Sequence, residues 1–158
     1  MKVAFTIVLI LVAQISVADG FVCVNETQDL KVQVYNHVSP QNGTRRGAVV
    51  VISNPLAPVG QKTLAVFSDD DGTLVSHGPT YTGKVDVRSV GDEDKVIGDV
   101  ELFRVDYMML DIDFVYGKPM VAGQLTTGVL NLIKTNLLNE SSTELEYEMS
   151  CRRYLKRN

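Results

Sequence analysis

Near its end the chain reads Thr143-Glu144-Leu145-Glu146-Tyr147-Glu148-Met149-Ser150-Cys151, with a polar side chain at every second position from Glu144 onward. A period of two is the pattern of a β-strand that buries one face and exposes the other. A helix would instead need apolar residues three and four apart along the chain. The stretch therefore predicts a strand whose glutamates face solvent.

The same alternation or a short apolar run recurs along most of the chain. Gly128–Ile133 could form a short helix, but it has no polar face at helical spacing and is interpreted as strand. The expected strands cover Lys31–Val34, Ala48–Ile52, Lys62–Phe67, Thr80–Val90, Val100–Tyr116, Val121–Lys134 and Thr143–Cys151. Turn residues separate them: Gln41–Gly43, Asn54-Pro55, Asp70–Gly72, Gly91-Asp92, Gly117–Pro119 and Asn139-Glu140. The sequence predicts an all-β domain, either a small antiparallel barrel or a sandwich.

Two cysteines, Cys23 and Cys151, lie near opposite ends of this set of strands. In an oxidising compartment two thiols most simply pair with each other, so we expect one disulfide. It would close a loop of most of the chain and stabilise the fold by about 4–5 kcal/mol in the chain-entropy model. The bridge requires the first and last strands to be neighbours, which favours a barrel without excluding a sandwich.

The beginning of the chain predicts an export signal. Lys2 supplies a basic start, Val3–Val12 is an almost unbroken apolar run, and Ser16–Ala18 has the small-x-small pattern that signal peptidase accepts. We expect a signal peptide over 1–18 and a single domain over 19–158 that is periplasmic, outer-surface or extracellular. A content of 45% hydrophobic and 22% charged residues, with net charge −4, is that of a globular protein rather than a disordered or collagen-like one.

Motifs for catalysis or metal binding are scarce. Ser68–Thr73 is rich in aspartate, but it lacks the ligand order and closing glutamate of an EF-hand, and Asp-Gly between apolar runs indicates a hairpin turn. His37 and His77, the two histidines, have no Cys, Asp or Glu at metal-ligand spacing. We expect no catalytic triad, no metal and no cofactor. The alternative is a secreted hydrolase whose site is assembled from distant Asp, Glu, His and Tyr residues.

Charge is distributed unevenly along the chain. Asp111 and Asp113 share one strand face, and three glutamates share the face of the 143–151 stretch. If these strands were neighbours, the carboxylates would repel each other unless cations or basic partners lay between them. The interpretation we favour is that the two strands lie apart. The basic tail Arg152–Arg157 could contact an anionic surface or the acidic body of the protein, whereas an acidic exported domain without a wide basic face does not fit a nucleic-acid partner.

The long segment 100–116 contains a break in parity. Phe103, Val105 and Tyr107 would face inward before it, whereas the inward set after it would be Leu110, Ile112, Phe114 and Tyr116. Because Tyr107 and Leu110 are three apart, a β-bulge is expected at Met108-Met109. Bulges often lie beside sites, and methionine adapts to varied partners. Tyr107, Met108 and Met109 are therefore our candidate contact residues for an apolar ligand or a protein partner.

Three sequons for N-glycosylation occur, at Asn25, Asn42 and Asn139. They matter only if the host modifies exported proteins by that route.

The segments Lys31–His37, Gly43–Arg46 and Cys151–Lys156 resemble small exported proteins of Gram-negative bacteria that have no assigned function. The resemblance covers both ends of the expected mature chain and less of its middle. It implies a β-rich periplasmic or outer-surface protein, and it supplies no site residue. A eukaryotic secreted origin stays open. With no catalytic pattern, the sequence leads us to expect an exported non-catalytic binding or structural module.

Overall fold

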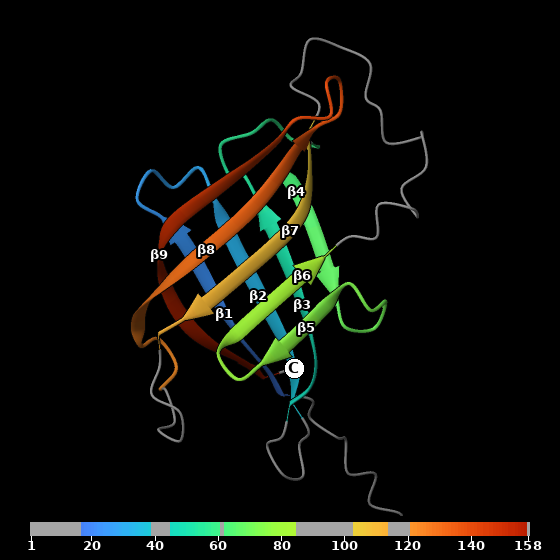
Figure 1. The fold of residues 1–158 in the computed structure, drawn as a ribbon. Helices are drawn as coiled ribbons and strands as arrows, with labels where there is room; N and C mark the ends of the chain where they lie inside the picture. Colours follow the sequence, from blue (N-terminus) through green and yellow to red (C-terminus); the bar gives the residue numbers. More distant parts are fainter. Residues whose placement is uncertain (1–16, 39–44, 61, 85–102, 114–120, 158) are drawn as a thin grey trace, which may run out of the picture.

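A computed structural model describes residues 17–38, 45–60, 62–84, 103–113 and 121–157, and these form a single antiparallel sheet of nine strands (Figure 1). No helix occurs within these ranges. The strands are β1 (Val17–Asn25), β2 (Lys31–Val38), β3 (Arg45–Ser53), β4 (Thr63–Ser68), β5 (Leu74–His77), β6 (Thr80–Lys84), β7 (Phe103–Ile112), β8 (Leu125–Asn136) and β9 (Ser142–Arg157).

The sheet curls into a nearly closed barrel, which confirms the predicted all-β class. Its order is β4-β3-β2-β1-β9-β8-β7-β6-β5. β9 is long enough to pair with two strands in succession: residues 142–152 pair with β8 and residues 149–157 pair with β1. Figure 1 shows β9 bending around the side of the molecule, from the layer of β5–β8 to the layer of β1–β4.

The nine strands leave one seam, between β4 and β5. Eight antiparallel pairs separate these two strands around the sheet, so β4 and β5 run in the same direction, as their arrows in Figure 1 show. Two parallel strands cannot be joined as a hairpin, and the connection over 69–73 carries the chain onward instead of reversing it. The chain turns at Asp70–Gly72 as predicted. It does not form a hairpin there, because β4 and β5 are not paired, so that expectation was wrong.

The interior is filled by the inward-facing residues of both layers. Gly83 leaves room for the Phe67 ring, since a Cβ at residue 83 would lie 2.6 Å from that ring's Cδ1. This contact packs β4 against β6 behind the seam. The buried apolar set is Phe21, Cys23, Leu30, Val32, Val34, Ala48, Val50, Ile52, Phe67, Leu74, Tyr81, Val105, Met108, Leu110, Ile112, Leu130, Leu132, Met149 and Cys151.

The predicted disulfide is present. Cys23 and Cys151 are direct partners in the β1–β9 ladder, with their Cα atoms 4.0 Å apart, and both side chains are fully buried. The bridge lies at the place where β9 passes from β8 to β1. It therefore joins the two layers covalently at the bend.

The predicted bulge exists, but it lies two residues earlier than expected. The β7–β8 register shifts between Val105 and Tyr107, whereas the pairing of Met108 and Met109 with β6 is regular. Because Val105 and Met108 are both buried, the two residues between them face outward together. The expectation that Tyr107 faces inward was therefore wrong, while Leu110 and Ile112 are buried as predicted.

Hydrogen bonding explains the position of the bulge. Asp106, the extra residue, accepts hydrogen bonds from Arg104 and from Thr135 on β8. Burial raises the pKa of the Asp106 carboxyl, but these hydrogen bonds and the Arg104 charge outweigh it and hold that pKa below its usual value. A methionine thioether is only a weak hydrogen-bond acceptor, so a bulge at Met108-Met109 would gain nothing comparable.

The strands of the structure differ from the predicted segments at several places along the chain. The strand Leu74–His77 was not predicted, because four residues next to a Gly-Pro turn give little periodicity. β1 begins at Val17, so the expected cleavage after Ala18 falls inside this strand. Several predicted features lie outside the described residues: most of the signal peptide, Gln41–Gly43, Val85–Val90, Gly91-Asp92, Phe114, Tyr116 and Gly117–Pro119.

We predict that Cys23→Ala/Cys151→Ala is less stable than the native protein by about 4 kcal/mol, because the unfolded chain regains the entropy that the bridge removes. Urea unfolding of the double variant and of the native protein, with and without reductant, measures this difference. Reduced native protein should unfold like the variant. Two free thiols in the intact mass of the unreduced protein would contradict the bridge.

We predict that Asp106→Asn destabilises the protein by about 1 kcal/mol at neutral pH, where the native carboxylate is charged. Because the folded-state pKa is lowered, this contribution is complete above the unfolded pKa of about 3.9 and is lost as pH falls through the folded value. The urea unfolding midpoints of the native protein and of Asp106→Asn should differ at pH 7 and converge as the pH is lowered to about 2. The control is Asp70→Asn, an exposed position, where a comparable pH-dependent difference would show that the effect is not local.

Candidate functional site

A groove of about 940 Å³ opens on the outside of the barrel, where the ends of β1, β7 and β8 meet the bend of β9. Val24, Pro79 and Val129 contribute apolar surface to it. The described residues that line it are Val24, Asn25, Glu26, Pro79, Asp111, Ile112, Asp113, Thr127, Gly128, Val129, Glu148, Met149 and Ser150.

Strand register brings the carboxylates of this groove together. Asp111 pairs with Val129, and Val129 pairs with Glu148, so the two acidic residues flank one valine across three strands. Two strand spacings separate them by about 10 Å. The backbone N–H of Asp113 donates to the Thr127 carbonyl, which places a third carboxylate on the same face, two residues further along the chain from Asp111. Our expectation that the acidic strands lie apart is only partly right: β8 separates them, but they share one face.

The charged side chains that line the groove are all acidic. Glu26, Asp111, Asp113 and Glu148 are exposed, and no described lining residue is a lysine, arginine or histidine. Asp111 accepts a hydrogen bond of 2.8 Å from the Thr80 hydroxyl, which orients that carboxylate without neutralising it. Such a surface attracts cationic groups.

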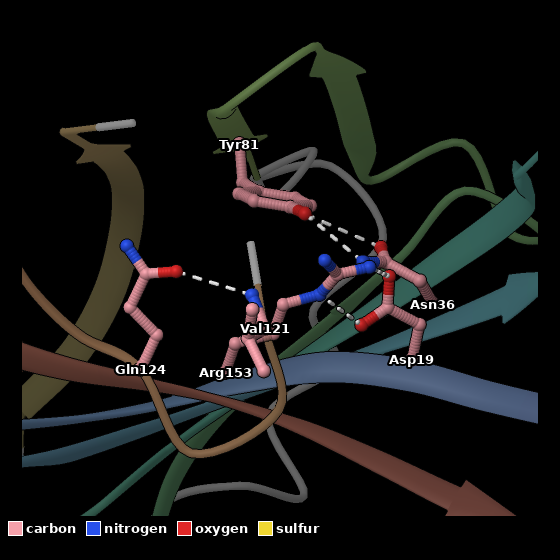
Figure 2. A network of polar contacts seen from close by, with 6 residues as sticks. All are labelled: Asp19, Asn36, Tyr81, Val121, Gln124 and Arg153. Carbon is pink, nitrogen blue, oxygen red and sulfur yellow. Dashed lines mark hydrogen bonds and ion pairs between the residues drawn. The ribbon is translucent and has the colours of Figure 1, made fainter. Parts of the chain in front are cut away.

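Inside the barrel, polar side chains form a network (Figure 2). Arg153 of β9 donates two hydrogen bonds to Asp19 of β1, at 3.0 and 2.8 Å, and this contact raises the pKa of the guanidinium. The Asn36 amide and the Tyr81 hydroxyl lie 3.2–3.3 Å apart, and both side chains are buried. These groups satisfy one another across β1, β2, β6 and β9, so the network is structural.

The predicted basic tail belongs to the sheet, because β9 continues to Arg157. Arg152 is exposed, whereas Arg153 lies inside against Asp19. Tyr154 packs over Gly20, and its hydroxyl donates to the Val34 carbonyl at 2.7 Å. Burial, with Tyr35 and Asp19 nearby, raises the pKa of Tyr154 to about 12. The sequence interpretation missed that residues 152–154 continue the alternation of the preceding strand, which would have indicated that they belong to it.

The other sequence candidates are dispersed over the surface. His37 is exposed on β2 and His77 is exposed at the end of β5. In the 69–73 connection, Asp69 accepts from the Ala48 N–H, and Thr73 lowers the pKa of Asp71 by donating from both its hydroxyl and its N–H. Within the described ranges, no group of three or more His, Cys, Asp and Glu residues is arranged to hold a metal ion.

The structure separates the three candidate contact residues. Met108 is fully buried in the core, whereas Tyr107 and Met109 are partly exposed on the outside of β7. None of the three lines the groove. Sequence reasoning placed a site near the bulge, whereas the hollow in the surface lies at the far end of the same strand.

Comparisons with protein-family models, with curated proteins and with solved structures found no match. Within the described part of the chain, no helix has the length and apolarity needed to cross a membrane.

We predict that Met108→Ala costs about 2–5 kcal/mol of stability, because it leaves a cavity among fully buried neighbours. The matched variant Met109→Ala, on the other face of β7, should cost less than about 1 kcal/mol. Urea unfolding of both variants checks the ranking. A larger cost at residue 109 would contradict the inward and outward assignment after the bulge.

Proposed function

We propose that this protein is an exported, non-catalytic binding module that holds a cationic, partly apolar ligand or protein segment in the groove at the β9 bend. The observation that carries the proposal is a hollow lined by four carboxylates, with apolar surface between them and no cationic side chain among its described residues.

The groove fits a ligand of mixed character. Asp111 and Glu148 stand on either side of Val129, so a chain with positive groups at its edges and an apolar centre meets matching surface across three strands. Exposed carboxylates keep their hydration until a ligand binds, and each contact contributes modestly, about 0.2–1 kcal/mol. Affinity therefore depends on several carboxylates acting together.

The proposed location follows from the disulfide and the leader. A buried disulfide is typical of oxidising compartments outside the cytoplasm. The basic start, the apolar run and the small-x-small pattern of residues 1–18 are those of a secretory signal. We therefore place the mature protein in the periplasm, at the cell surface or in the extracellular medium.

The test is binding of a fluorescently labelled peptide of alternating lysine and valine, followed by anisotropy at low salt. We predict that Asp111→Asn/Glu148→Gln weakens binding about tenfold, which corresponds to about 1.4 kcal/mol. The matched control, Glu144→Gln/Glu146→Gln, removes the same charge from exposed positions of β9 outside the groove. It should change the affinity by less than about twofold.

Equal losses in both double variants would mean that the peptide responds only to net charge, which would contradict a defined site. Binding that is unaffected by the groove variant would contradict it as well. Binding should weaken with added salt, because exposed charges are screened within about 10 Å at 0.1 M.

A further inference from the structure

One sequon lies at an exposed tip of the barrel. Asn139, Glu140 and Ser141 are all exposed in the connection between β8 and β9, which the hydrogen bond from the Asn136 N–H to the Ser141 carbonyl closes at 2.9 Å. The Asn139 Oδ1 accepts from the Ser141 N–H at 3.1 Å and from the Ser141 hydroxyl at 2.7 Å. Its Nδ2 donates to no atom of the described residues.

A second sequon, at Asn25, is chemically identical but differently placed. Asn25 is 8% exposed. Its Nδ2 donates to Thr27 at 2.8 Å and to Asp29 at 2.6 Å, and its Oδ1 accepts from the Leu30 N–H at 2.9 Å. Both amide hydrogens are therefore used to close the β1–β2 turn. A sugar on this nitrogen would take the place of one of the two amide hydrogens, so one of these hydrogen bonds would be lost. It would also place a bulky polar group at a buried position.

We propose that Asn139 is an N-glycosylation site and that Asn25 is not, in a secretory compartment containing an oligosaccharyltransferase. In the transfer, the Asn139 Nδ2 attacks the anomeric carbon of a lipid-pyrophosphate-linked oligosaccharide. A C–N bond forms, and the C–O bond to the pyrophosphate breaks. The lipid pyrophosphate leaves with the bonding electrons, and the amide nitrogen gives one proton to a base of the transferase.

The position of Asn139 suits a binding module. The groove includes Thr127–Val129 near the start of β8, whereas Asn139 follows the end of that strand. Seven residues of strand from Val129 to Asn136 span about 23 Å, so a glycan at the tip leaves the groove open. Asn25 itself lines the groove, and a glycan there would fill it. The inference rests on the export that we propose, because the transferase acts only in that pathway.

The experiment expresses the full chain in a secreting eukaryotic cell line, with Asn42→Gln in every version because residue 42 lies outside the described ranges. One version keeps residues 1–18, and a second carries a host leader before Asp19. Secreted protein is deglycosylated enzymatically in heavy-oxygen water, which converts each formerly glycosylated asparagine to labelled aspartate. Peptide mass spectrometry then reads residues 25 and 139 separately.

We expect the label at Asn139 and none at Asn25 in the disulfide-bonded protein. Ser141→Ala should lose the glycan completely, and Ser141→Thr, which keeps the hydroxyl, should retain it. An unmodified Asn139, or a modified Asn25, in the secreted and bridged protein would overturn the inference. Secretion only with the host leader would contradict the native export signal instead, and the glycan would still be read from that protein.

Discussion

The barrel depends on the ladder between β1 and β9, which joins the two ends of the described chain. It runs from the pair Val17–Arg157 to the pair Asn25–Met149. Without it, β1–β4 and β5–β9 would be two separate antiparallel sheets connected by residues 69–73. Closing so long a loop costs conformational entropy that no local contact offsets. The Cys23–Cys151 bridge lies within this ladder and limits that entropy in the unfolded chain.

The same ladder accounts for the groove. β9 pairs with β8 along its first half and with β1 along its second, so it must bend where the two pairings overlap at residues 149–152. The outer face of this region carries Glu148, with Asp111 across β8 and Glu26 beyond the end of β1. The charges inside the barrel have a different role: Arg153 and Asp19 neutralise each other, whereas the groove carboxylates remain exposed.

Sequence alone predicted the strand class and the existence of a bulge, because alternation is a local signal. It also predicted the disulfide, because two cysteines allow only one pairing within the chain. The sequence placed the bulge two residues too late. The alternation of apolar residues shows that the strand must contain one extra residue, but it does not show which residue hydrogen bonds stabilise in that position. Asp106 is stabilised there by Arg104 and by Thr135, and residue 135 is brought near only by the β7–β8 register. The groove was missed for the same reason. The acidic faces were visible in the sequence, but their separation by a single valine depends on pairings that no periodicity specifies.

The position of the disulfide determines how the barrel responds to mechanical tension. Val17 and Arg157 are partners at one end of an antiparallel ladder, so pulling on the two ends would open the pairs one after another instead of shearing them together. Peeling would proceed to Cys23 and Cys151 and stop there, because the sulfur–sulfur bond carries the load beyond that point. The chain between the cysteines, which holds most of the core and of the acidic groove, would stay folded. A module tethered by both ends would therefore stretch slightly and keep its binding surface intact.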